Sequence, residues 1–271
     1  MEQNKLFDII ISGDDPAGLE LAMALSGHNK SICYITENWE ANDRLNWDGK
    51  RVTIVNGHVI YMGFIHGVII ATVQAKYKYN SIYGATATQV CGTHFVIAHS
   101  DSYAPLDVPS DTKIYYELVD LPLQDRDKKT LAILGNSKEL TDTAMKLAKE
   151  YKNIYYCFDT QRPEGPAIIV NKTGKLENVQ YLPLCKVKKI EKGTVYLSTG
   201  AEIKADHILA FNGRMPNISG IPTNMITVDK TNHIVVDENY HTGPIPTMYA
   251  IGTVCNKTSA SDSIKLFKQL V

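Results

Sequence analysis

Hydrophobic and polar positions in the first 36 residues follow two patterns, which predict a strand, a helix and a second strand. Residues 7–12 (FDIIIS) form a short run of β-branched and apolar residues that is typical of a buried strand. The run stops at a turn, residues 13–18 (GDDPAG), and continues as LELAMAL, whose apolar residues suit a buried helix. Residues 31–36 (SICYIT) again have the composition of a buried strand. This order predicts the opening βαβ unit of a parallel α/β sheet.

The turn between this strand and helix has most of the spacing of a dinucleotide-binding motif. In such motifs, glycines let the backbone approach a pyrophosphate, which binds at the N-terminus of the helix. Gly13 and Gly18 take the first and last glycine positions, and Ala17 precedes the last one. The middle position is Asp15, whose carboxylate would repel a pyrophosphate lying about 4–6 Å away. We therefore expect a retained fold with weakened ligand binding.

An acidic residue at the end of the next strand would bind a ribose. Glu37 closes that strand about twenty residues beyond the turn, which is the spacing the motif expects. The alternative interpretation is a solvated glutamate that simply ends a surface strand. Likewise, Asp14 and Asp15 are either paired carboxylates or, as we favour, ordinary turn residues.

The same strand, glycine and helix pattern returns about 120 residues later at residues 130–151, followed by a strand at 153–158. Between the two units, short apolar runs separated by Asn56-Gly57, Gly63 and Gly67 predict an inserted antiparallel β-meander. Two nucleotide-binding-type domains follow, residues 1–108 joined by 218–271, and residues 109–217. The meander runs are 51–55, 59–65, 68–76 and 81–83; further strands are expected at 93–98, 167–170, 179–184, 193–198, 207–211, 233–237 and 248–252, and a last helix at 261–270.

Composition excludes several function classes. With 28 basic and 29 acidic residues, the chain has no electrostatic footprint for nucleic acid or an anionic membrane. No signal pattern or long apolar run is present, so we expect a cytoplasmic protein. The five cysteines include no C-x-x-C pair, which argues against a zinc site or a disulfide framework. His58 and His66 are too far apart along a strand to chelate a metal, so no metal is expected.

The arrangement resembles the thioredoxin-reductase branch of the flavin- and pyridine-nucleotide-dependent disulfide oxidoreductases. The resemblance rests on Gly13–Gly18 with Glu37, on Gly135, and on segments 210–217 (AFNGRMPN) and 248–252 (MYAIG). It implies an α/β fold of two Rossmann-like domains in a three-layer ββα arrangement, the first of them discontinuous. It also implies FAD in the first domain, NADPH in the second, and a C-x-x-C-D motif that cycles between dithiol and disulfide.

The redox and NADPH positions of the family are altered in this chain. Alignment with the family's redox motif puts Tyr116 and Val119 in the two cysteine positions, so this motif cannot form a thiolate. Ser137 and Leu140 replace a glycine and a small residue in the second dinucleotide turn. A single arginine, Arg162, follows the next strand where the family carries a basic cluster. NAD(P) binding is therefore not expected.

The FAD positions are also altered. Ala98-His99-Ser100 stands where the family has an Ala-Thr-Gly strand end, and Thr253 replaces the aspartate that follows Gly252. FAD binding is expected to be weakened. His94 and His99 flank a buried strand, where a histidine is more often a hydrogen-bonded structural residue than a general base.

Two hypotheses follow. The first is a degenerate family member that keeps the scaffold as a non-catalytic binding or regulatory protein, with an adenine nucleotide or a protein as partner and a homodimer left open. The second is an FAD-dependent NAD(P)H oxidoreductase that acts without the cysteine pair. Function resides in sites rather than folds, so the geometry of these positions decides between them.

Overall fold

The chain divides into two compact units in the computed structural model, which describes residues 5–37, 52–79, 82–256 and 260–271. Unit 1 consists of residues 1–102 and 215–271, and unit 2 of residues 103–214. These boundaries lie six and three residues before those that the sequence suggests. The chain passes between the units at two short strands that pair with each other, β6 (Asp101–Tyr103) and β14 (Arg214–Pro216).

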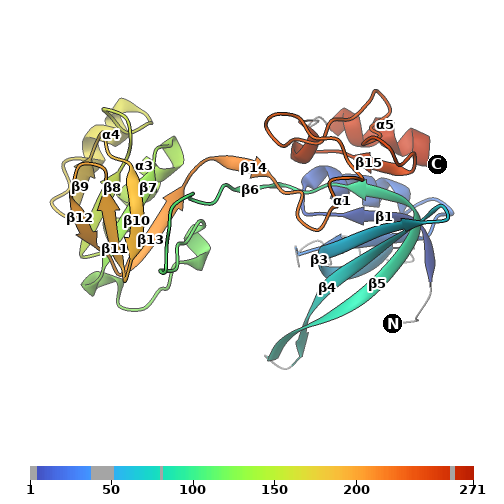
Figure 1. Cartoon of the computed structure of the whole chain (residues 1–271), viewed down its shortest axis with the longest axis horizontal. Coiled ribbons are helices and arrows are strands. Elements are labelled where there is room, and N and C mark those ends of the chain that lie inside the picture. The colour runs from blue at the N-terminus through green and yellow to red at the C-terminus, as the bar shows by residue number, and fades with distance from the viewer. Residues whose placement is uncertain (1–4, 38–51, 80–81, 257–259) are drawn as a thin grey trace. The chain divides into compact units, whose positions relative to one another are not determined.

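Unit 1 is built on a sheet whose parallel strands come from both ends of the chain (Figure 1). The strand β1 (Leu6–Ser12) lies between β2 (Ile32–Thr36) and β5 (Ile82–Ile97), and is parallel to both. The short strand β15 (Met248–Ala250) adds to the other side of β5, again in parallel. The C-terminal segment therefore returns to complete the sheet that the N-terminal residues begin.

The meander of unit 1 has three long strands where the sequence pattern predicts shorter ones. The strands β3 (Val52–Ile65), β4 (Val68–Tyr79) and β5 pair antiparallel, and β3 also runs parallel to β2. The predicted break at Asn56-Gly57 is wrong, because Gly57 continues the ladder opposite Ala75. A Cβ on Gly57 would lie 2.2 Å from the carbonyl oxygen of Gln74, so this glycine permits close strand approach rather than a turn. Arg51 and Ser81, which begin two of the predicted runs, lie outside the described residues.

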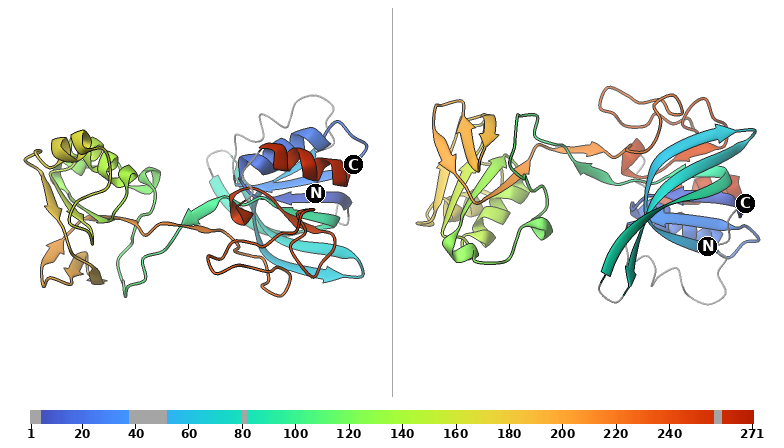
Figure 2. Two further views of the ribbon diagram at one scale, coloured as in Figure 1. Left: turned by 90° about the horizontal axis from the view of Figure 1, so that it is seen from above. Right: turned by 60° about the horizontal axis from the view of Figure 1, so that its bottom comes forward.

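Alternating residues of β1 face two separate cores. Ile10 packs toward the meander, whereas Ile9 and Ile11 pack toward the helices α1 (Pro16–Leu25) and α5 (Ala260–Leu270). Figure 2 shows these two helices side by side on one face of the sheet. Unit 1 thus has three layers, of meander, parallel sheet and helices, as the sequence predicts.

Unit 2 combines a four-stranded parallel sheet with an antiparallel one. The parallel strands, in spatial order, are β13 (His207–Phe211), β7 (Thr130–Gly135), β8 (Asn153–Cys157) and β9 (Val179–Leu182). The antiparallel strands are β10 (Val187–Glu191), β11 (Thr194–Leu197) and β12 (Glu202–Lys204). The helix α3 (Lys138–Leu147) joins β7 to β8. Short 3₁₀ turns are η1 (Leu118–Asp120), η2 (Arg126–Lys128) and, in unit 1, η3 (Thr253–Cys255).

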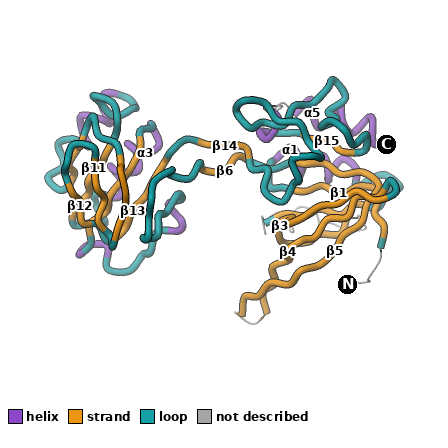
Figure 3. Tube along the Cα trace, viewed as in Figure 1, coloured by secondary structure: helices purple, strands orange, loops and turns teal. Residues whose placement is uncertain are grey.

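Two predicted strands are not strands. Residues 167–170 belong to the helix α4 (Ala167–Thr173), although their β-branched side chains favour a strand. Parallel β8 and β9 require a crossover connection, and α4 lies in it. Residues 233–237 form only an isolated bridge between Ile234 and Val228. Figure 3 shows segment 217–247 as loop.

The α/β class and the two Rossmann-like sheets that the sequence predicts are confirmed. Within the described residues, no helix combines the length and apolar character needed to cross a bilayer.

Candidate functional site

The N-terminus of α1 carries its own carboxylate. Asp15 is the N-cap residue, and its Oδ1 accepts a hydrogen bond of 2.9 Å from the backbone N–H of Ala17. Its Oδ2 accepts two more, each of 3.0 Å, from the backbone N–H and the hydroxyl of Thr253. Asp15 is only 5% exposed. The free N–H groups that a helix N-terminus offers to an anion are thus bound, in part, by a side chain of the same chain.

The loop that follows β15 fits closely around this carboxylate. A Cβ placed on Gly252 would lie 2.5 Å from Cγ of Asp15. Gly252 also has φ +84, which side-chain-bearing residues rarely adopt. The loop carrying Thr253 therefore lies directly against Asp15, in the space where the middle glycine of the motif would leave room for a pyrophosphate.

The two glycines of the turn have the packing roles that the motif predicts. A Cβ on Gly13 would lie 1.9 Å from the carbonyl oxygen of Ala98, and a Cβ on Gly18 would lie 2.6 Å from Cβ of Ala98. Both glycines therefore allow α1 and its preceding turn to approach β5 closely. Ala17, next to Gly18, is buried in the core between sheet and helices.

Glu37 lies at the end of β2, as predicted, beside Gly13 and His58 at a small cavity. Its Oε1 lies 2.9 Å from Nδ1 of His58 at the surface. The cavity has a volume of about 60 Å³, whereas small-molecule sites are usually about 300–1,000 Å³. The described residues leave too little space here for an adenosine group.

His99 fills part of the same region. Its Nδ1 lies 2.8 Å from the carbonyl oxygen of Asn217, which can only accept, so Nδ1 carries a proton. Its Nε2 lies 3.0 Å from Oγ of Ser12 and, in the neutral ring, accepts from that hydroxyl. Burial lowers the pKa of His99. The ring is a hydrogen-bonded structural histidine, which is the interpretation that the sequence favours.

Asp14 points to a different partner from Asp15. It is exposed, and its Oδ1 accepts a hydrogen bond of 3.0 Å from the backbone N–H of Ser100. The two neighbouring carboxylates do not form a joint site. Among the described residues, no group of three or more histidine, cysteine or acidic side chains could hold a metal ion.

The second glycine turn, in unit 2, is bridged by side chains. Gly135 is required because a Cβ there would lie 2.0 Å from the carbonyl oxygen of Phe211. Ser137 caps α3, its Oγ accepting from the backbone N–H of Leu140. Asn136 donates to Oγ1 of Thr160 and accepts from the backbone N–H of Glu164, both at 2.7 Å. These bonds link the turn after β7 to the loop after β8.

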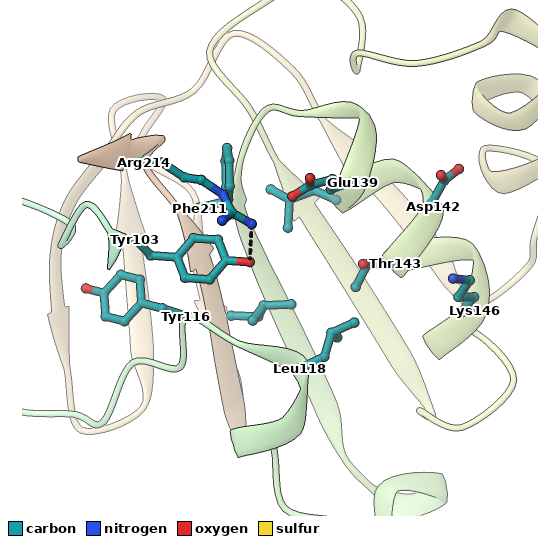
Figure 4. A pocket seen from close by; sticks show the side chains of 11 residues that line it. Tyr103, Tyr116, Leu118, Glu139, Asp142, Thr143, Lys146, Phe211 and Arg214 are labelled. Atoms are coloured by element: carbon teal, nitrogen blue, oxygen red, sulfur yellow. Dashed lines mark hydrogen bonds between the residues drawn. The ribbon is translucent and has the colours of Figure 1, made fainter. Parts of the chain in front are cut away.

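The segment in which the family carries its redox cysteines contains no thiol. Tyr116 accepts a hydrogen bond of 2.9 Å from the backbone N–H of Leu106, and Val119 is 85% exposed in η1. Tyr116 lines an open cavity of about 350 Å³ in unit 2 (Figure 4). Arg214 donates there to the hydroxyl of Tyr103, and α3 contributes Glu139, Asp142 and Lys146. The charged side chains of this cavity are of both signs. Among its described lining residues, no nucleophilic side chain is hydrogen-bonded to a base.

The sequence comparison decides the family. Residues 7–268 match the family described as pyridine nucleotide-disulphide oxidoreductase. The chain belongs to this family. No curated protein matches the sequence.

Solved structures show the same fold at low identity. Bacillithiol disulfide reductase from Bacillus cereus has a TM-score of 0.75 at 13% identity, covering 98% of this chain and 99% of that one. Thioredoxin reductase from Lactococcus lactis has a TM-score of 0.71 at 15% identity, covering 97% of each chain. The thioredoxin reductase from T. acidophilum has a TM-score of 0.69 at 16% identity, covering 98% and 99%. The predicted resemblance to thioredoxin reductases is thus confirmed.

The structure brings together the predicted FAD-site residues Gly13, Asp15, Ala17, Gly18, Gly252 and Thr253 around one helix N-terminus, with Glu37 across the turn. The sequence predicts Asp15 and Thr253 as separate site residues, and only the structure shows that they are hydrogen-bonded to each other. The bound carboxylate of Asp15, the loop at Gly252 and the ring of His99 thus lie at positions that the family resemblance assigns to the FAD site.

Proposed function

We propose that this chain is a non-catalytic member of the family, which has lost FAD-dependent disulfide reduction and acts as a binding or regulatory protein. The observation that carries the proposal is the carboxylate of Asp15, held at the N-terminus of α1 by Ala17 and Thr253. A pyrophosphate bound there would have to displace a buried, hydrogen-bonded anion. That displacement costs the bonds to the carboxylate and places like charges together.

Three further features support the proposal. The cavity beside Glu37 is too small for an adenosine group. The second glycine turn is bridged by Asn136 and capped by Ser137. Tyr116 and Val119 supply no thiolate. Disulfide reduction in the family needs a flavin site, a nicotinamide site and a dithiol, and each feature removes one of these in turn.

The direct test is the visible absorption spectrum of freshly purified protein, before and after incubation with excess FAD and gel filtration. We expect no flavin bands in either sample. Flavin retained near one equivalent per chain would overturn the proposal and support the alternative, an FAD-dependent NAD(P)H oxidoreductase that acts without the cysteine pair. NADPH oxidation by the FAD-treated protein, measured in parallel, would then report whether that alternative holds.

A further inference from the structure

Two cysteines that lie 28 residues apart in sequence meet in unit 2. Cys157 ends β8, and Cys185 follows β9. The backbone holds them in register, because Phe158 N–H donates to Leu182 O at 3.1 Å and Cys185 N–H donates to Phe158 O at 3.0 Å. Cys157 pairs directly with Leu182 across the two strands, and the Cys185 thiol donates a hydrogen bond of 3.0 Å to the carbonyl oxygen of Leu182. Both cysteines therefore lie in one buried cluster and line one cavity. The pair has no C-x-x-C spacing and is created by the fold alone.

A strained turn brings Cys185 back to the end of β8. Leu184 has φ +56, in the left-handed region that leucine rarely adopts, and its side chain is 60% exposed. Its backbone N–H donates to the carbonyl oxygen of Thr160 at 3.0 Å. The exposed leucine side chain contributes little burial to offset this strain. Strain of this kind is concentrated at functional positions, so the turn itself requires an explanation.

The pair borders a cavity of about 510 Å³ at the carboxyl ends of β7 and β8. Gly135, Asn136 and Thr160 line the same cavity. Open parallel sheets bind their ligands at this edge. Cys157 and Cys185 line this cavity but are only 2% and 4% exposed. Only a reagent small enough to enter the cavity can therefore approach them, whereas a thiol carried on another protein cannot.

The two thiols differ in acidity. The neighbouring Cys157 side chain lowers the pKa of the Cys185 thiol, while burial and the Asp159 carboxylate oppose that effect. The Cys185 side chain, together with burial, raises the pKa of Cys157. One sulfur is therefore favoured as thiolate and its neighbour as thiol, which is the division between an attacking and a resolving cysteine. By contrast, burial raises the pKa of Cys33 to about 12, which keeps it inert.

We propose that Cys157 and Cys185 form a redox pair that a hydroperoxide oxidises to an intramolecular disulfide. The Cys185 thiolate attacks the peroxide oxygen, the O–O bond breaks, and the departing alkoxide or hydroxide takes a proton, leaving a sulfenic acid. The sulfur of Cys157 then attacks the sulfenic sulfur, and the hydroxyl leaves with the Cys157 proton as water. Two thiols and one hydroperoxide thus give one disulfide, one alcohol (or water) and one water. A dithiol reductant restores the pair.

The disulfide would fix the end of β8 to the turn before β10, at the wall of the cavity. Oxidation would thereby change the cavity that the Asn136 bridge borders. This redox pair lies wholly in unit 2 and is independent of whether unit 1 binds FAD.

The test uses the full native chain and hydrogen peroxide. After treatment, the protein is denatured, alkylated and weighed by intact mass spectrometry. We expect alkylated cysteines to fall from five to three, and the loss to reverse with dithiothreitol. After tryptic digestion, residues 153–172 and 176–186 should appear as one linked species. Five alkylated cysteines, or a link between other cysteines, would overturn the proposal.

Single variants separate the two roles. In Cys157→Ser, Cys185 should be trapped as a sulfenic acid by dimedone, whereas in Cys185→Ser no sulfenic acid should form at Cys157. The matched control is Cys91→Ser, in which the link between Cys157 and Cys185 should form as in the unaltered chain. Equal dimedone labelling in both variants would contradict the assigned roles. Mapping of the unaltered chain tests the disulfide even if a variant does not fold.

Discussion

Asp15 and Thr253 lie 238 positions apart in the sequence, yet Oδ2 of Asp15 accepts two hydrogen bonds of 3.0 Å from Thr253. Family members resembling thioredoxin reductase would have a glycine at the first position and an aspartate at the second. This chain has the acidic residue at the helix N-terminus and a threonine in the loop. The carboxylate therefore stabilises the helix N-terminus from within the fold.

Replacing Asp15 should open the pyrophosphate position. Two like charges about 4 Å apart cost on the order of 4 kcal/mol at an effective dielectric near 20, so Asp15→Gly should raise affinity for FAD and ADP by up to roughly a thousandfold. Asp15→Asn also removes the charge but keeps a side chain against Gly252, so its gain should fall short of that of Asp15→Gly by the amount that this side chain costs. Isothermal titration of each variant gives the comparison.

Asp14→Gly is the control for that experiment, because Asp14 is exposed and binds Ser100. It should leave both affinities nearly unchanged. Adding Thr253→Asp to Asp15→Gly should strengthen FAD binding further and leave ADP binding unaffected, since that aspartate would contact the flavin end. Unchanged FAD and ADP affinity in Asp15→Gly would mean that the obstacle to binding lies elsewhere.

Close packing of α1 on β5 should make Gly18 intolerant of a side chain. A Cβ there would lie 2.6 Å from Cβ of Ala98, which cannot rotate away. Gly18→Ala should destabilise the protein by about 1–3 kcal/mol, despite the better helix propensity of alanine. Gly27→Ala is the matched control, because nothing lies within 4 Å of its Cβ position. Urea midpoints that shift equally in both variants would refute the packing argument.

Much of this architecture is visible in the sequence because local signals agree with tertiary packing. The segments 7–36 and 130–158 each carry a buried strand, a required glycine and a helix, and all of these elements form. The local signals mislead where the propensity of a segment conflicts with the connection that the sheet requires. Residues 167–170 have the β-branched side chains of a strand but form a helix, because β8 and β9 are parallel and the connection between them must cross over.

The candidate sites were predictable only in part, for a related reason. Position by position, Asp15 and Thr253 each depart from the family pattern, and the sequence shows both departures. Their mutual hydrogen bonds depend on β15 returning beside β5, which no local pattern encodes. The meeting of Cys157 and Cys185 depends on the left-handed turn at Leu184, a residue type that does not indicate such a turn.

Disulfide reduction with NADPH should be absent. Tyr116 and Val119 cannot form a thiolate, and Asn136 and Ser137 alter the nicotinamide side. Tyr116→Cys with Val119→Cys should therefore not restore activity, even with excess FAD. NADPH oxidation would be followed with a thioredoxin-like disulfide, with an active thioredoxin reductase as the positive control. Turnover above the buffer blank would contradict this account.

Acid should destabilise the protein partly through His99. Burial lowers the pKa of this histidine below its ordinary value of 6.5, so below that pH the unfolded chain binds a proton that the folded chain does not. The contribution of His99 to the free energy of unfolding should thus be fully present above about pH 7. It should fall by up to about 1.4 kcal/mol by about pH 5.5. The lowered pKa values of Asp8 and Asp229 act in a separate, more acidic range near and below 3.8.

His99→Gln isolates that contribution, because glutamine can donate to the Asn217 carbonyl and accept from Ser12 without titrating. The variant should therefore lose less stability than the unaltered chain between pH 7.5 and pH 5.5, measured from urea unfolding of unit 1 at each pH. His66→Asn is the control, because His66 is exposed with φ +48, a conformation that asparagine tolerates. A pH dependence that persists unchanged in His99→Gln would show that the folded protein accommodates the protonated ring, because the Asn217 carbonyl, which raises the pKa, then offsets the burial that lowers it. The sign of the difference therefore measures whether burial outweighs that hydrogen bond.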